Sequence, residues 1–427
     1  MDKKNKKVGV IGLGYVGLPL ALRTMEKGYD VIGVDLDETK IEKIKSGQSP
    51  FLEEFVEERI DLLKKFPVSN NPKNLKDVDI AIICVPTPVD KSYYPNLKPL
   101  KSAVQSVIEN LKKKQLVIIE STINPGVCEE VVEPMFAEKD LQEGKDYYLA
   151  HCPERIDPGN KKWDVSNIPR VVGSMSKKGL EEAKVFYESI IDGKIKPMKS
   201  IRAAEAVKVV ENSFRDVNIA FVNELAQSFD QMGIDVKDVI DGAATKPFAF
   251  LAHYPSRGVG GHCIPVDPYY LIEEARRKGF DHQFLRTARR INNYMPIYTV
   301  KILQDSLNQI ERPLKKTKVG VLGLSYKANI DDLRESPSFK IIEELKKKGA
   351  EVITFDPYIK EKSDVKSLEE LLGKSDALIL VTNHKDFLNK EDSFKKFGIK
   401  AIVDGVNCLD REKIKNSGIN YHGIGRF

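Results

Sequence analysis

The sequence predicts an α/β protein in which two doubly wound parallel sheets are joined by a central region of long helices. Three observations predict this class. A short apolar run near the N-terminus ends in closely spaced glycines and leads into a helical pattern. A similar run returns after residue 317, and from about residue 200 to 310 apolar residues recur at helical spacing. We therefore expect three domains, 1–199, 200–310 and 311–427, which suits a chain of 427 residues.

The composition excludes several classes of function. Hydrophobic residues make up 41% of the chain and charged residues 31%, so a large core can form. The net charge is only +5 and the lysines are spread out, which leaves no basic patch for nucleic acid. No apolar run is long enough to span a membrane, and no secretory signal is recognisable. The five cysteines are odd in number and lack a CxxC pair, so we expect a reducing, cytoplasmic compartment.

The first domain begins with KVGVIGLGYVG, whose first five residues form a β-rich run. Gly12, Gly14 and Gly17 follow as GxGxxG. Gly12 allows a tight turn, Gly14 lets the backbone approach a pyrophosphate, and Gly17 lets the helix pack close to the strand. The next strand, YDVIGV, leads to Asp35, whose carboxylate would accept from ribose hydroxyls and repel a 2′-phosphate. We therefore predict a Rossmann-like domain that binds NAD rather than NADP; the alternative is a glycine-rich turn without cofactor.

Two further strands of the buried type end in residues with hydroxyl groups. DIAIICVPTP ends in a turn that contains Thr87, and QLVIIESTINPG reaches Thr122. Ligands bind at the carboxyl ends of the strands in an open parallel sheet. Thr87 and Thr122 are therefore candidates for cofactor or substrate contacts, although Thr87 could equally be a turn residue or a helix cap.

The third domain repeats the pattern of the first. KVGVLGLSYKA matches KVGVIGLGYVG in seven of eleven places, and GAEVITFDPY and DALILVTNH repeat the two strands that follow. Ser325 and Ala328 replace two of the motif glycines, so a dinucleotide should fit less well. Lys327 enters the loop and Arg334 follows it, and these cations suit a different phosphate-bearing ligand. The third domain is thus predicted to be Rossmann-like with another ligand.

The central region begins with more than thirty residues, from Ile201, that contain no internal glycine or proline. This length predicts a spine helix that also offers a dimer surface, and two shorter helices with a kink are the alternative. Lys208 and Asn212 lie four residues apart on one helix face. Such a pair could hold a developing oxyanion or could simply be solvated.

Two turn-like segments contain the remaining reactive groups. CPERIDPG follows an apolar run and places Glu154 and Arg155 between two prolines, where Glu154 could be a general base or part of a surface salt bridge. GVGGHCIPVDP places Cys263 after glycines that permit close approach of a ligand. Cys263 could be a reactive thiol, a metal ligand or an inert buried residue. The pairs His151–Cys152 and His262–Cys263 lack zinc-ligand spacing, so we expect no metal.

Together these motifs resemble the UDP-sugar 6-dehydrogenases of the UDP-glucose/GDP-mannose dehydrogenase superfamily over nearly the whole chain. The matching segments, in order, are VGVIGLGYVGLPLA, VPTP, STINPG, CPERIDPG, AVKVVENSFRDVNIAFVNE, GVGGHCIPVDPYYL and GLSYKANIDDLRESP. The forms CPER, RDVNIAF and GGHCI resemble the N-acetylhexosamine branch, and the UDP-N-acetyl-D-mannosamine dehydrogenases in particular. UDP-N-acetylglucosamine 6-dehydrogenases are the alternative. Pro158 stands where glucose-type members have a glutamate, and Arg257 stands where a proline is often found.

The resemblance implies an activity. Two NAD molecules per turnover would oxidise the C6 alcohol of a UDP-N-acetylhexosamine to a carboxylate. Cys263 would add to the C6 aldehyde, and the thiohemiacetal would be oxidised to a thioester and then hydrolysed. Lys208 and Asn212 would hold the C6 oxygen. Three residues would position or deprotonate water: Thr122, Glu154 and Asp267.

The resemblance also implies two binding sites and an assembly. The NAD positions are Gly12, Gly14, Val16, Gly17, Asp35, Lys40, Thr87, Thr122 and Arg334. The UDP-sugar positions are Arg155, Ile156, Lys208, Asn212, Arg215, Gly260, Tyr326 and Lys327. A homodimer or larger homo-oligomer is expected, without nucleic acid or membrane as a partner.

Two hypotheses from other classes remain. A two-electron 3-hydroxyacid-type dehydrogenase would share the Rossmann-like domain and the Lys-xxx-Asn helix, but it would need neither Cys263 nor the second nucleotide-type domain. A non-catalytic NAD sensor would give Lys208, Asn212 and Cys263 no chemical role.

Overall fold

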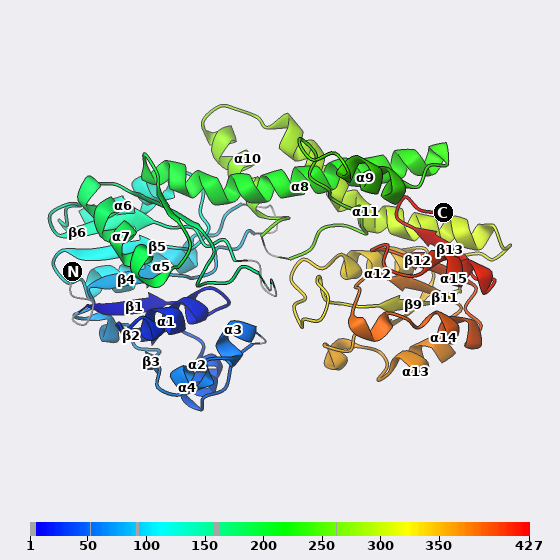
Figure 1. Cartoon of the computed structure of the whole chain (residues 1–427), viewed down its shortest axis with the longest axis horizontal. Coiled ribbons are helices and arrows are strands. Elements are labelled where there is room, and N and C mark those ends of the chain that lie inside the picture. Colours follow the sequence, from blue (N-terminus) through cyan, green and yellow to red (C-terminus); the bar gives the residue numbers. More distant parts are fainter. Residues whose placement is uncertain (1–5, 52, 91–93, 157–159, 161, 262) are drawn as a thin grey trace. The chain divides into compact units, whose positions relative to one another are not determined.

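The computed structural model describes residues 6–51, 53–90, 94–156, 160, 162–261 and 263–427. The chain forms two compact units, whose elements Figure 1 labels. Unit 1 comprises Met1–Glu211 and Tyr269–Phe280, and unit 2 comprises Asn212–Pro268 and Asp281–Phe427. Pro158 and His262, two positions at which the sequence departs from glucose-type relatives, lie outside the described residues.

Unit 1 is built on an eight-stranded sheet with the order β3-β2-β1-β4-β5-β6-β7-β8. Its strands are β1 (Lys7–Ile11), β2 (Asp30–Val34), β3 (Val68–Ser69), β4 (Ile80–Ile83), β5 (Gln115–Ile119), β6 (Tyr147–His151), β7 (Arg170–Ser174) and β8 (Ile195–Pro197). Neighbouring strands are parallel except β6 and β7, which are antiparallel. The first six strands have the Rossmann order, which reverses between β1 and β4, so the prediction of a doubly wound first sheet is confirmed.

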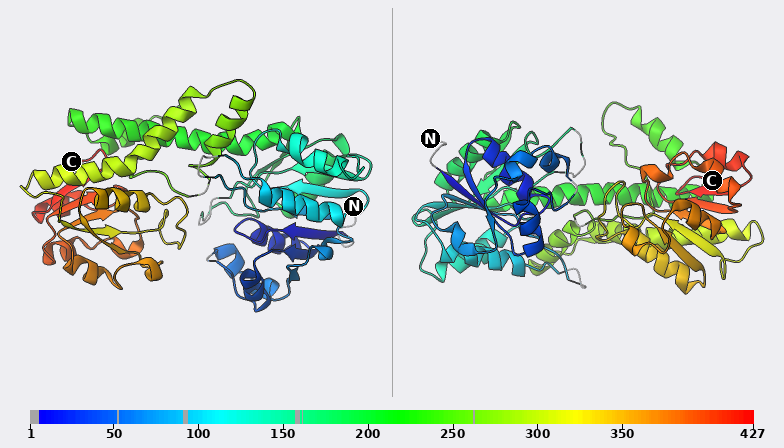
Figure 2. Two further views of the ribbon diagram at one scale, coloured as in Figure 1. Left: turned by 180° about the vertical axis from the view of Figure 1, so that it is seen from behind. Right: turned by 90° about the horizontal axis from the view of Figure 1, so that it is seen from below.

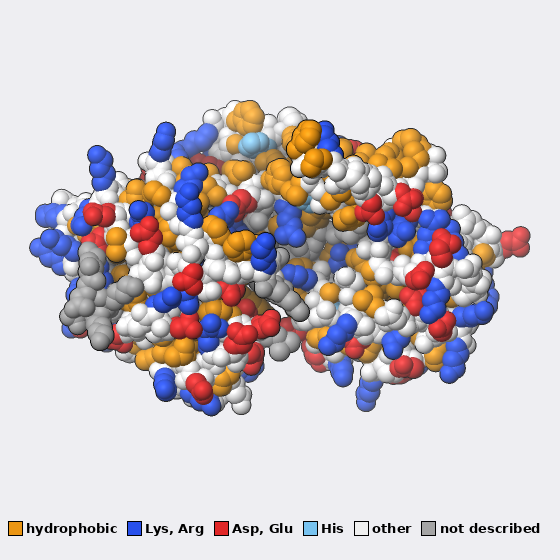
Figure 3. All heavy atoms as spheres, in the orientation of Figure 1, with side chains coloured by type: hydrophobic (Ala, Val, Ile, Leu, Met, Phe, Trp, Pro, Cys, Tyr) orange, Lys and Arg blue, Asp and Glu red, His pale blue; other side chains and the backbone are white. Residues whose placement is uncertain are grey.

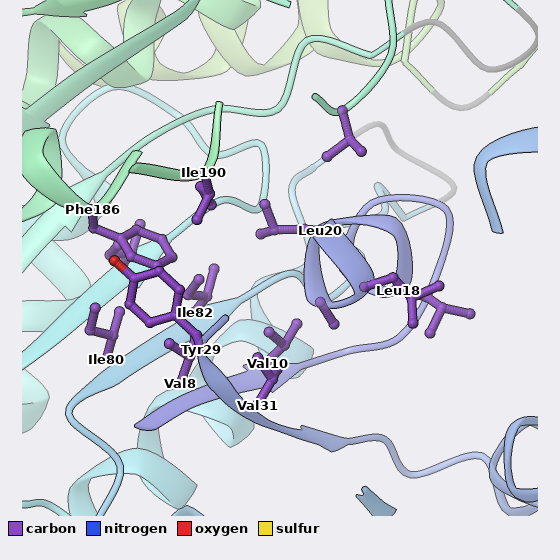
Figure 4. Close-up of a cluster of buried hydrophobic side chains, with 14 of the residues drawn as sticks. Val8, Val10, Leu18, Leu20, Tyr29, Val31, Ile80, Ile82, Phe186 and Ile190 are labelled. Atoms are coloured by element: carbon purple, nitrogen blue, oxygen red, sulfur yellow. The ribbon is translucent and has the colours of Figure 1, made fainter. Parts of the chain in front are cut away.

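The two faces of this sheet pack into separate cores because successive residues of a strand point to opposite sides. Ile80 and Ile82 of β4 belong to one core, whereas Ala81 and Ile83 belong to the other. In the first core, side chains of helices α1 and α7 pack on those of β1, β2 and β4 (Figure 4).

The helices of unit 1 are α1 (Gly17–Glu26), α2 (Glu38–Lys45), α3 (Glu54–Glu57), α4 (Ile60–Leu63), α5 (Lys98–Glu109), α6 (Glu133–Ala137), α7 (Lys177–Ile190) and most of α10 (Asp267–Arg277), with a 3₁₀ turn at Pro72–Leu75 and a π turn at Cys128–Val132.

Unit 2 contains a five-stranded, fully parallel sheet with the order β10-β9-β11-β12-β13. Its strands are β9 (Lys318–Leu322), β10 (Glu351–Phe355), β11 (Ala377–Leu380), β12 (Ala401–Asp404) and β13 (Asn420–Gly423). Its helices are α9 (Val236–Ala244), α11 (Gln283–Asn308), α12 (Pro337–Lys347), α13 (Leu368–Gly373), α14 (Glu391–Lys396) and α15 (Arg411–Asn416), with 3₁₀ turns at Lys360–Lys362 and Lys385–Phe387. The strand order reverses between β9 and β11, so the prediction of a second doubly wound sheet is also confirmed.

Helix α8 (Ile201–Met232) is unbroken over 32 residues, as the absence of internal glycine and proline predicts, and the kinked alternative is not observed (Figure 2). The boundary between the units falls inside it, after Glu211. Helix α11 is also long and contains Pro296. Among the described helices, none combines the length and the apolar character that a membrane crossing needs.

Candidate active site

The turn after β1 has the shape that its glycines predict. Gly12 has a φ of +90°, and a Cβ there would meet the carbonyl oxygen of Cys84 at 2.7 Å. A Cβ on Gly17 would stand 1.9 Å from the carbonyl oxygen of Gly12, so α1 can begin this close to β1 only with glycine. At Gly14 a Cβ would meet nothing within 4 Å, and Val16, the N-cap of α1, supplies no side-chain capping bond. The turn is thus tight inside and open at Gly14, which fits a pyrophosphate.

Asp35 follows β2 and is buried, with 9% of the residue exposed. Its Oδ2 accepts hydrogen bonds from the N–H of Leu13 at 2.7 Å and from Nζ of Lys40 at 2.8 Å. Its Oδ1 accepts from the N–H of Asp37 at 3.0 Å. Burial raises the pKa of Asp35, but the partners, with Lys40 the strongest of them, outweigh burial and leave the pKa lowered. The carboxylate is therefore charged at neutral pH and lies beside the glycine turn, which suits recognition of ribose hydroxyls.

The two threonines predicted at strand ends contact each other. The hydroxyl of Thr87, a buried side chain, donates to the carbonyl oxygen of Thr122 at 2.6 Å. The carbonyl oxygen of Thr87 accepts from the hydroxyl of Tyr270 on α10. Thr122 is half-buried. The Thr87 hydroxyl therefore joins the segments that follow β4 and β5, and a cofactor contact by either threonine stays a prediction.

Glu154 follows β6 and is buried. Its Oε1 accepts from the N–H groups of Arg155 at 2.5 Å and Ile156 at 2.8 Å. Its Oε2 forms an ion pair with Nη2 of Arg170 at 2.5 Å. The carboxylate is thus held on both oxygens, and of the two alternatives a salt bridge is present, although it is buried rather than at the surface.

The sheet explains why Arg170 reaches this carboxylate. β7 is antiparallel to β6 in a register that pairs His151 with Gly173. The same register continued past the strand end sets Glu154 opposite Arg170, the first residue of β7. β5 is parallel to β6, and Glu120 is the first residue after it at the same edge. Arg170 accordingly lies 3.0 Å from Glu120 as well. The apolar run RVVGS gives no signal of its direction, so sequence reasoning missed Arg170 and Glu120.

Glu120 is fully buried and shares Arg170 with Glu154. The hydroxyl of Tyr187 donates to its Oε1 at 2.5 Å. Burial raises the pKa of Glu120 most strongly, Arg170 lowers it and Glu154 raises it again, with a resulting value of about 7. One cation between two carboxylates leaves an excess negative charge, which a proton on Glu120 would neutralise.

The three other predicted substrate residues of this region differ in exposure. Arg155 is held by Glu211 of α8, with Nη2 2.5 Å and Nε 3.1 Å from its carboxylate oxygens. Ile156 packs against the first core, and Arg215 is exposed on α8. Substrate contacts of these residues stay predictions.

In unit 2, Asn212, Cys263 and Asp267 are connected. Nδ2 of Asn212 donates to Oδ2 of Asp267 at 2.5 Å, and both side chains are buried. The N–H of Asp267, the first residue of α10, donates to the carbonyl oxygen of Cys263 at 2.9 Å. Cys263 is exposed, whereas Cys128 and Cys152 are buried. Lys208 is half-buried and lies one helical turn before Asn212 on α8. An accessible thiol thus stands at one end of a single turn and a buried, oriented carboxylate at the other.

The glycine turn before Cys263 packs on the loop that follows β9. A Cβ on Gly260 would stand 2.7 Å from Cβ of Tyr326, and the N–H of Gly261 donates to the carbonyl oxygen of Arg334 at 3.0 Å. Nη2 of Arg334 lies 2.6 Å from Oδ2 of Asp332. Two predicted substrate residues, Gly260 and Tyr326, are therefore neighbours, and the predicted NAD contact of Arg334 stays a prediction.

The carboxylate after β10 in the second sheet corresponds to that of Asp35 in the first, but it has an additional buried partner. Oδ2 of Asp356, after β10, accepts from the N–H of Leu324 at 2.7 Å, as Asp35 does in unit 1. Here Nε2 of His384 also lies 3.0 Å from that oxygen, and both side chains are fully buried. The N–H of Asn329 donates to Nδ1 of His384 at 2.9 Å, so the ring proton resides on Nε2 and points to Asp356. Sequence reasoning missed His384, although the repeated strand pattern aligned Asp356 with Asp35.

These contacts distinguish Asp356 from Asp35, the predicted ribose ligand of unit 1. Burial raises the pKa of Asp356, but His384 and the N–H groups of Ser325 and Leu324 lower it to about 2. The hydroxyl of Ser325 donates to the carbonyl oxygen of Lys327 at 2.9 Å, and Lys327 is half-buried. The Asp356–His384 pair therefore fixes the loop after β9 from its buried side. Because the Asp356 side chain is fully buried, it is not available to the hydroxyls of a dinucleotide ribose.

Among the described residues, no group of three or more His, Cys, Asp or Glu side chains is arranged to hold a metal ion. The imidazole of His151 is fully buried, which lowers its pKa to about 3. Burial likewise raises the pKa of the neighbouring Cys152 thiol to about 12.

Three segments of the chain match one protein family. Residues 6–191 match the NAD binding domain of the UDP-glucose/GDP-mannose dehydrogenase family. Residues 202–294 match its central domain, and residues 320–411 match its UDP binding domain.

Named relatives match over almost their full length. The chain is 38% identical to the UDP-N-acetyl-D-mannosamine dehydrogenase of Pyrococcus horikoshii, over 98% of this chain and 99% of the relative. It is 35% identical to the UDP-N-acetyl-D-glucosamine 6-dehydrogenase of Pseudomonas aeruginosa, over 96% and 99%. A solved structure of the UDP-D-ManNAc dehydrogenase of Pyrococcus horikoshii superimposes with a TM-score of 0.92 at 37% identity and covers 98% of this chain and 99% of that one.

Proposed function

Because the chain belongs to the UDP-glucose/GDP-mannose dehydrogenase family, we propose that it oxidises UDP-N-acetyl-D-mannosamine at C6 to UDP-N-acetyl-D-mannosaminuronate with two NAD per sugar. The main support in the structure is the turn from Cys263 to Asp267. It presents an exposed thiol and, through Asn212, an oriented carboxylate. A simple two-electron alcohol oxidation would need no such thiol.

The residues of unit 1 suit NAD. The open backbone at Gly14 would receive the pyrophosphate, and the charged carboxylate of Asp35 would accept from the adenosine ribose. Lys40 would orient that carboxylate from the side. Bound NAD supplies the hydride acceptor for each of the two oxidations.

The chemistry assigned to this chain's own residues follows from the substrate. Removal of a hydride and a proton from the C6 alcohol gives an aldehyde, to which the Cys263 thiolate adds as a thiohemiacetal. A second hydride loss gives a thioester, and water then releases the carboxylate and the thiol. Lys208 and Asn212 would hold the C6 oxygen while it carries charge.

Water attack on the thioester needs a positioned base. Asp267 is near the thiol in the chain and its side chain is already fixed by Asn212. The family resemblance also assigns water positioning to Glu154 and Thr122. Glu154 is paired with Arg170, which favours an orienting role over a proton-accepting one.

NADH formation with UDP-N-acetyl-D-mannosamine, UDP-N-acetyl-D-glucosamine and UDP-glucose, assayed side by side, tests the proposal. We expect the mannosamine epimer to be preferred and two NADH to form per sugar. The Cys263→Ala variant should give at most one slow equivalent, while the control Cys128→Ala should keep the full yield, because the Cys128 thiol is fully buried in a core of unit 1. Preference for the glucosamine epimer would assign the activity of the Pseudomonas relative instead, and one NADH per sugar in the natural chain would contradict the four-electron scheme.

We further infer that the chain forms a homodimer through an apolar patch of unit 2. The patch is formed by Phe214 and Phe221 of α8 and by Phe248, Leu251 and Tyr254 of the segment after α9, all of which are exposed. The rings of Phe214 and His253 lie 6.5 Å apart, which shows that the helix and the segment form one surface. Figure 3 shows hydrophobic side chains gathered over α9 and the adjacent part of α8. Exposed apolar surface of this kind is typical of protein interfaces.

We also infer a cytoplasmic location, which the odd number of cysteines, the lack of a CxxC pair and the use of NAD support.

A further inference from the structure

Arg257 is a buried cation at the carboxyl edge of the second sheet. Only 9% of the residue is exposed. Its N–H donates to the carbonyl oxygen of Gly405, directly after β12, at 2.7 Å. Its Nη2 donates to the carbonyl oxygen of Tyr326, in the loop after β9, at 2.9 Å. The side chain therefore reaches from one strand end toward another.

The guanidinium of Arg257 has no carboxylate partner among the described residues. Its Nε is fully covered and without a hydrogen bond, whereas Nη1 is not among the covered atoms. Burial lowers the pKa of Arg257 to about 10, and the one group that opposes this is the Cys408 thiol. A buried cation of this kind is unfavourable in the unliganded protein, because among the described residues the hydrogen bond that offsets its desolvation goes to one neutral carbonyl group, that of Tyr326.

The position of Arg257 is where open parallel sheets bind ligands. β9 and β11 flank the reversal of the strand order, and Tyr326 follows β9. Gly405 lies against the end of β11, since a Cβ there would stand 2.7 Å from the carbonyl oxygen of Leu380 and 3.1 Å from Cβ of Arg257. The glycine thus leaves room for the stem of Arg257 at the edge of the sheet.

We propose that Arg257 binds a phosphate group of the nucleoside diphosphate, which supplies the missing counter-ion. This inference rests on the proposed function, in which the substrate carries its charge on the diphosphate alone. Residues 320–411, which include Tyr326, match a UDP binding domain, whereas Arg257 lies outside that range. A guanidinium suits phosphate because its planar fork offers several donors at fixed geometry.

Calorimetric titration of UDP and of uridine into the full chain tests this proposal. In Arg257→Met we expect UDP to bind roughly 10–100-fold more weakly and uridine to bind unchanged, because one charge-assisted contact is lost. The UDP affinity of Arg257→Lys should lie between that of the natural chain and that of Arg257→Met. Arg312→Met is the matched control, because Arg312 is an exposed arginine of the same unit, 3.7 Å from Asp376. NAD affinity should not change in any of these variants.

The outcomes separate this proposal from the function it rests on. Equal weakening of UDP and uridine in Arg257→Met would mean that Arg257 only clamps the Tyr326 loop, and unchanged UDP affinity would exclude a phosphate contact. The natural chain binding UDP without forming NADH from UDP-sugars would contradict the proposed function alone. No UDP binding by the natural chain would overturn both.

Thermal unfolding without ligand gives a second, independent readout. A residue that only clamps the loop predicts a lower unfolding temperature in Arg257→Met. If Arg257 binds a phosphate, the unfolding temperature of Arg257→Met without ligand should be equal to or higher than that of the natural chain. The rise in this temperature on addition of UDP should be smaller in the variant. A lower temperature combined with an undiminished UDP-induced rise would refute the proposal.

Discussion

At the scale of single residues, the buried carboxyl of Glu120 is the group whose ionisation should be felt near neutral pH. Its pKa is raised from 4.5 to about 7, mainly by burial. The stabilisation associated with the protonated form is fully present below about pH 4.5 and is lost as the pH rises through 7. The ionisation of Glu120 therefore makes unit 1 less stable at pH 8 than at pH 5.

Glu120→Gln should remove this pH dependence. The free energy of unfolding of the variant, relative to the natural chain, should increase by about 3 kcal/mol between pH 5 and pH 8, because the amide does not ionise. Urea unfolding followed at several pH values measures the difference. Glu188→Gln, at an exposed glutamate of α7, is the control and should show no such trend. A constant difference across this range would refute a raised pKa for Glu120.

Asp35 should decide between NAD and NADP. In Asp35→Asn the negative charge is removed and Lys40 loses its ionic partner, so Lys40 becomes available to a 2′-phosphate. We expect the ratio of NADP to NAD affinity to rise roughly tenfold or more. Binding titrations with both cofactors measure this ratio. Glu42→Gln is the control, because Glu42 is exposed on α2, the helix that contains Lys40. An unchanged ratio would mean that Asp35 does not contact the ribose.

At the scale of elements, the loop after β9 depends on one buried imidazole. His384 ties Asp356 to the N–H of Asn329, and the loop between Leu324 and Asn329 contains Tyr326 and Lys327. Removing the ring would leave the Asp356 carboxylate and the Asn329 N–H without their buried partner, which is more costly than the loss of one exposed hydrogen bond. The ring therefore preserves the shape of the loop that is predicted to hold the UDP-sugar.

His384→Ala should lower the free energy of unfolding of unit 2 by about 2–4 kcal/mol and weaken UDP binding, while NAD binding is retained. His422→Ala, a half-buried histidine of the same unit whose Nε2 lies 3.4 Å from Oδ1 of Asp230, is the control and should have a smaller effect. Denaturant unfolding and UDP titration measure the two effects. Equal stability of the natural chain and His384→Ala would show that the loop does not need the ring.

At the scale of the whole molecule, the apolar patch of unit 2 should set the oligomeric state. Phe221 lies in the patch and is 53% exposed, so a charge there costs little in the separate chain but is unfavourable in an interface. Phe221→Asp should therefore dissociate the proposed homodimer without lowering the unfolding temperature of the units by more than a few degrees. Sedimentation measures the mass. Phe339→Asp, at a Phe of unit 2 that is 44% exposed and lies outside the patch, should leave the assembly intact. A monomeric natural chain would exclude the dimer.

The local features of the fold could be predicted from the sequence. The turn at Gly12 and Gly17, the carboxylate of Asp35 and the unbroken helix α8 follow from local rules of glycine placement, strand ends and helix length. The repeat of KVGVIGLGYVG as KVGVLGLSYKA indicated the second doubly wound sheet, and the ordered motifs indicated the family.

Other features depend on which strands become neighbours, which no local pattern specifies. Arg170 reaches Glu154 only because β7 turns antiparallel beside β6, and it reaches Glu120 because β5 lies on the other side. His384 meets Asp356 across the reversal of the strand order.

By itself, the sequence determined the two sheets, the NAD turn and the family. The tertiary structure alone decided which charges are paired. It buried the Arg257 guanidinium against the carbonyl of Tyr326, with no carboxylate partner among the residues that the structure describes, and it shared Arg170 between two glutamates. The physical reason is that a side chain's burial and ionisation depend on neighbours distant in the chain, which only the packing of strands and loops brings together.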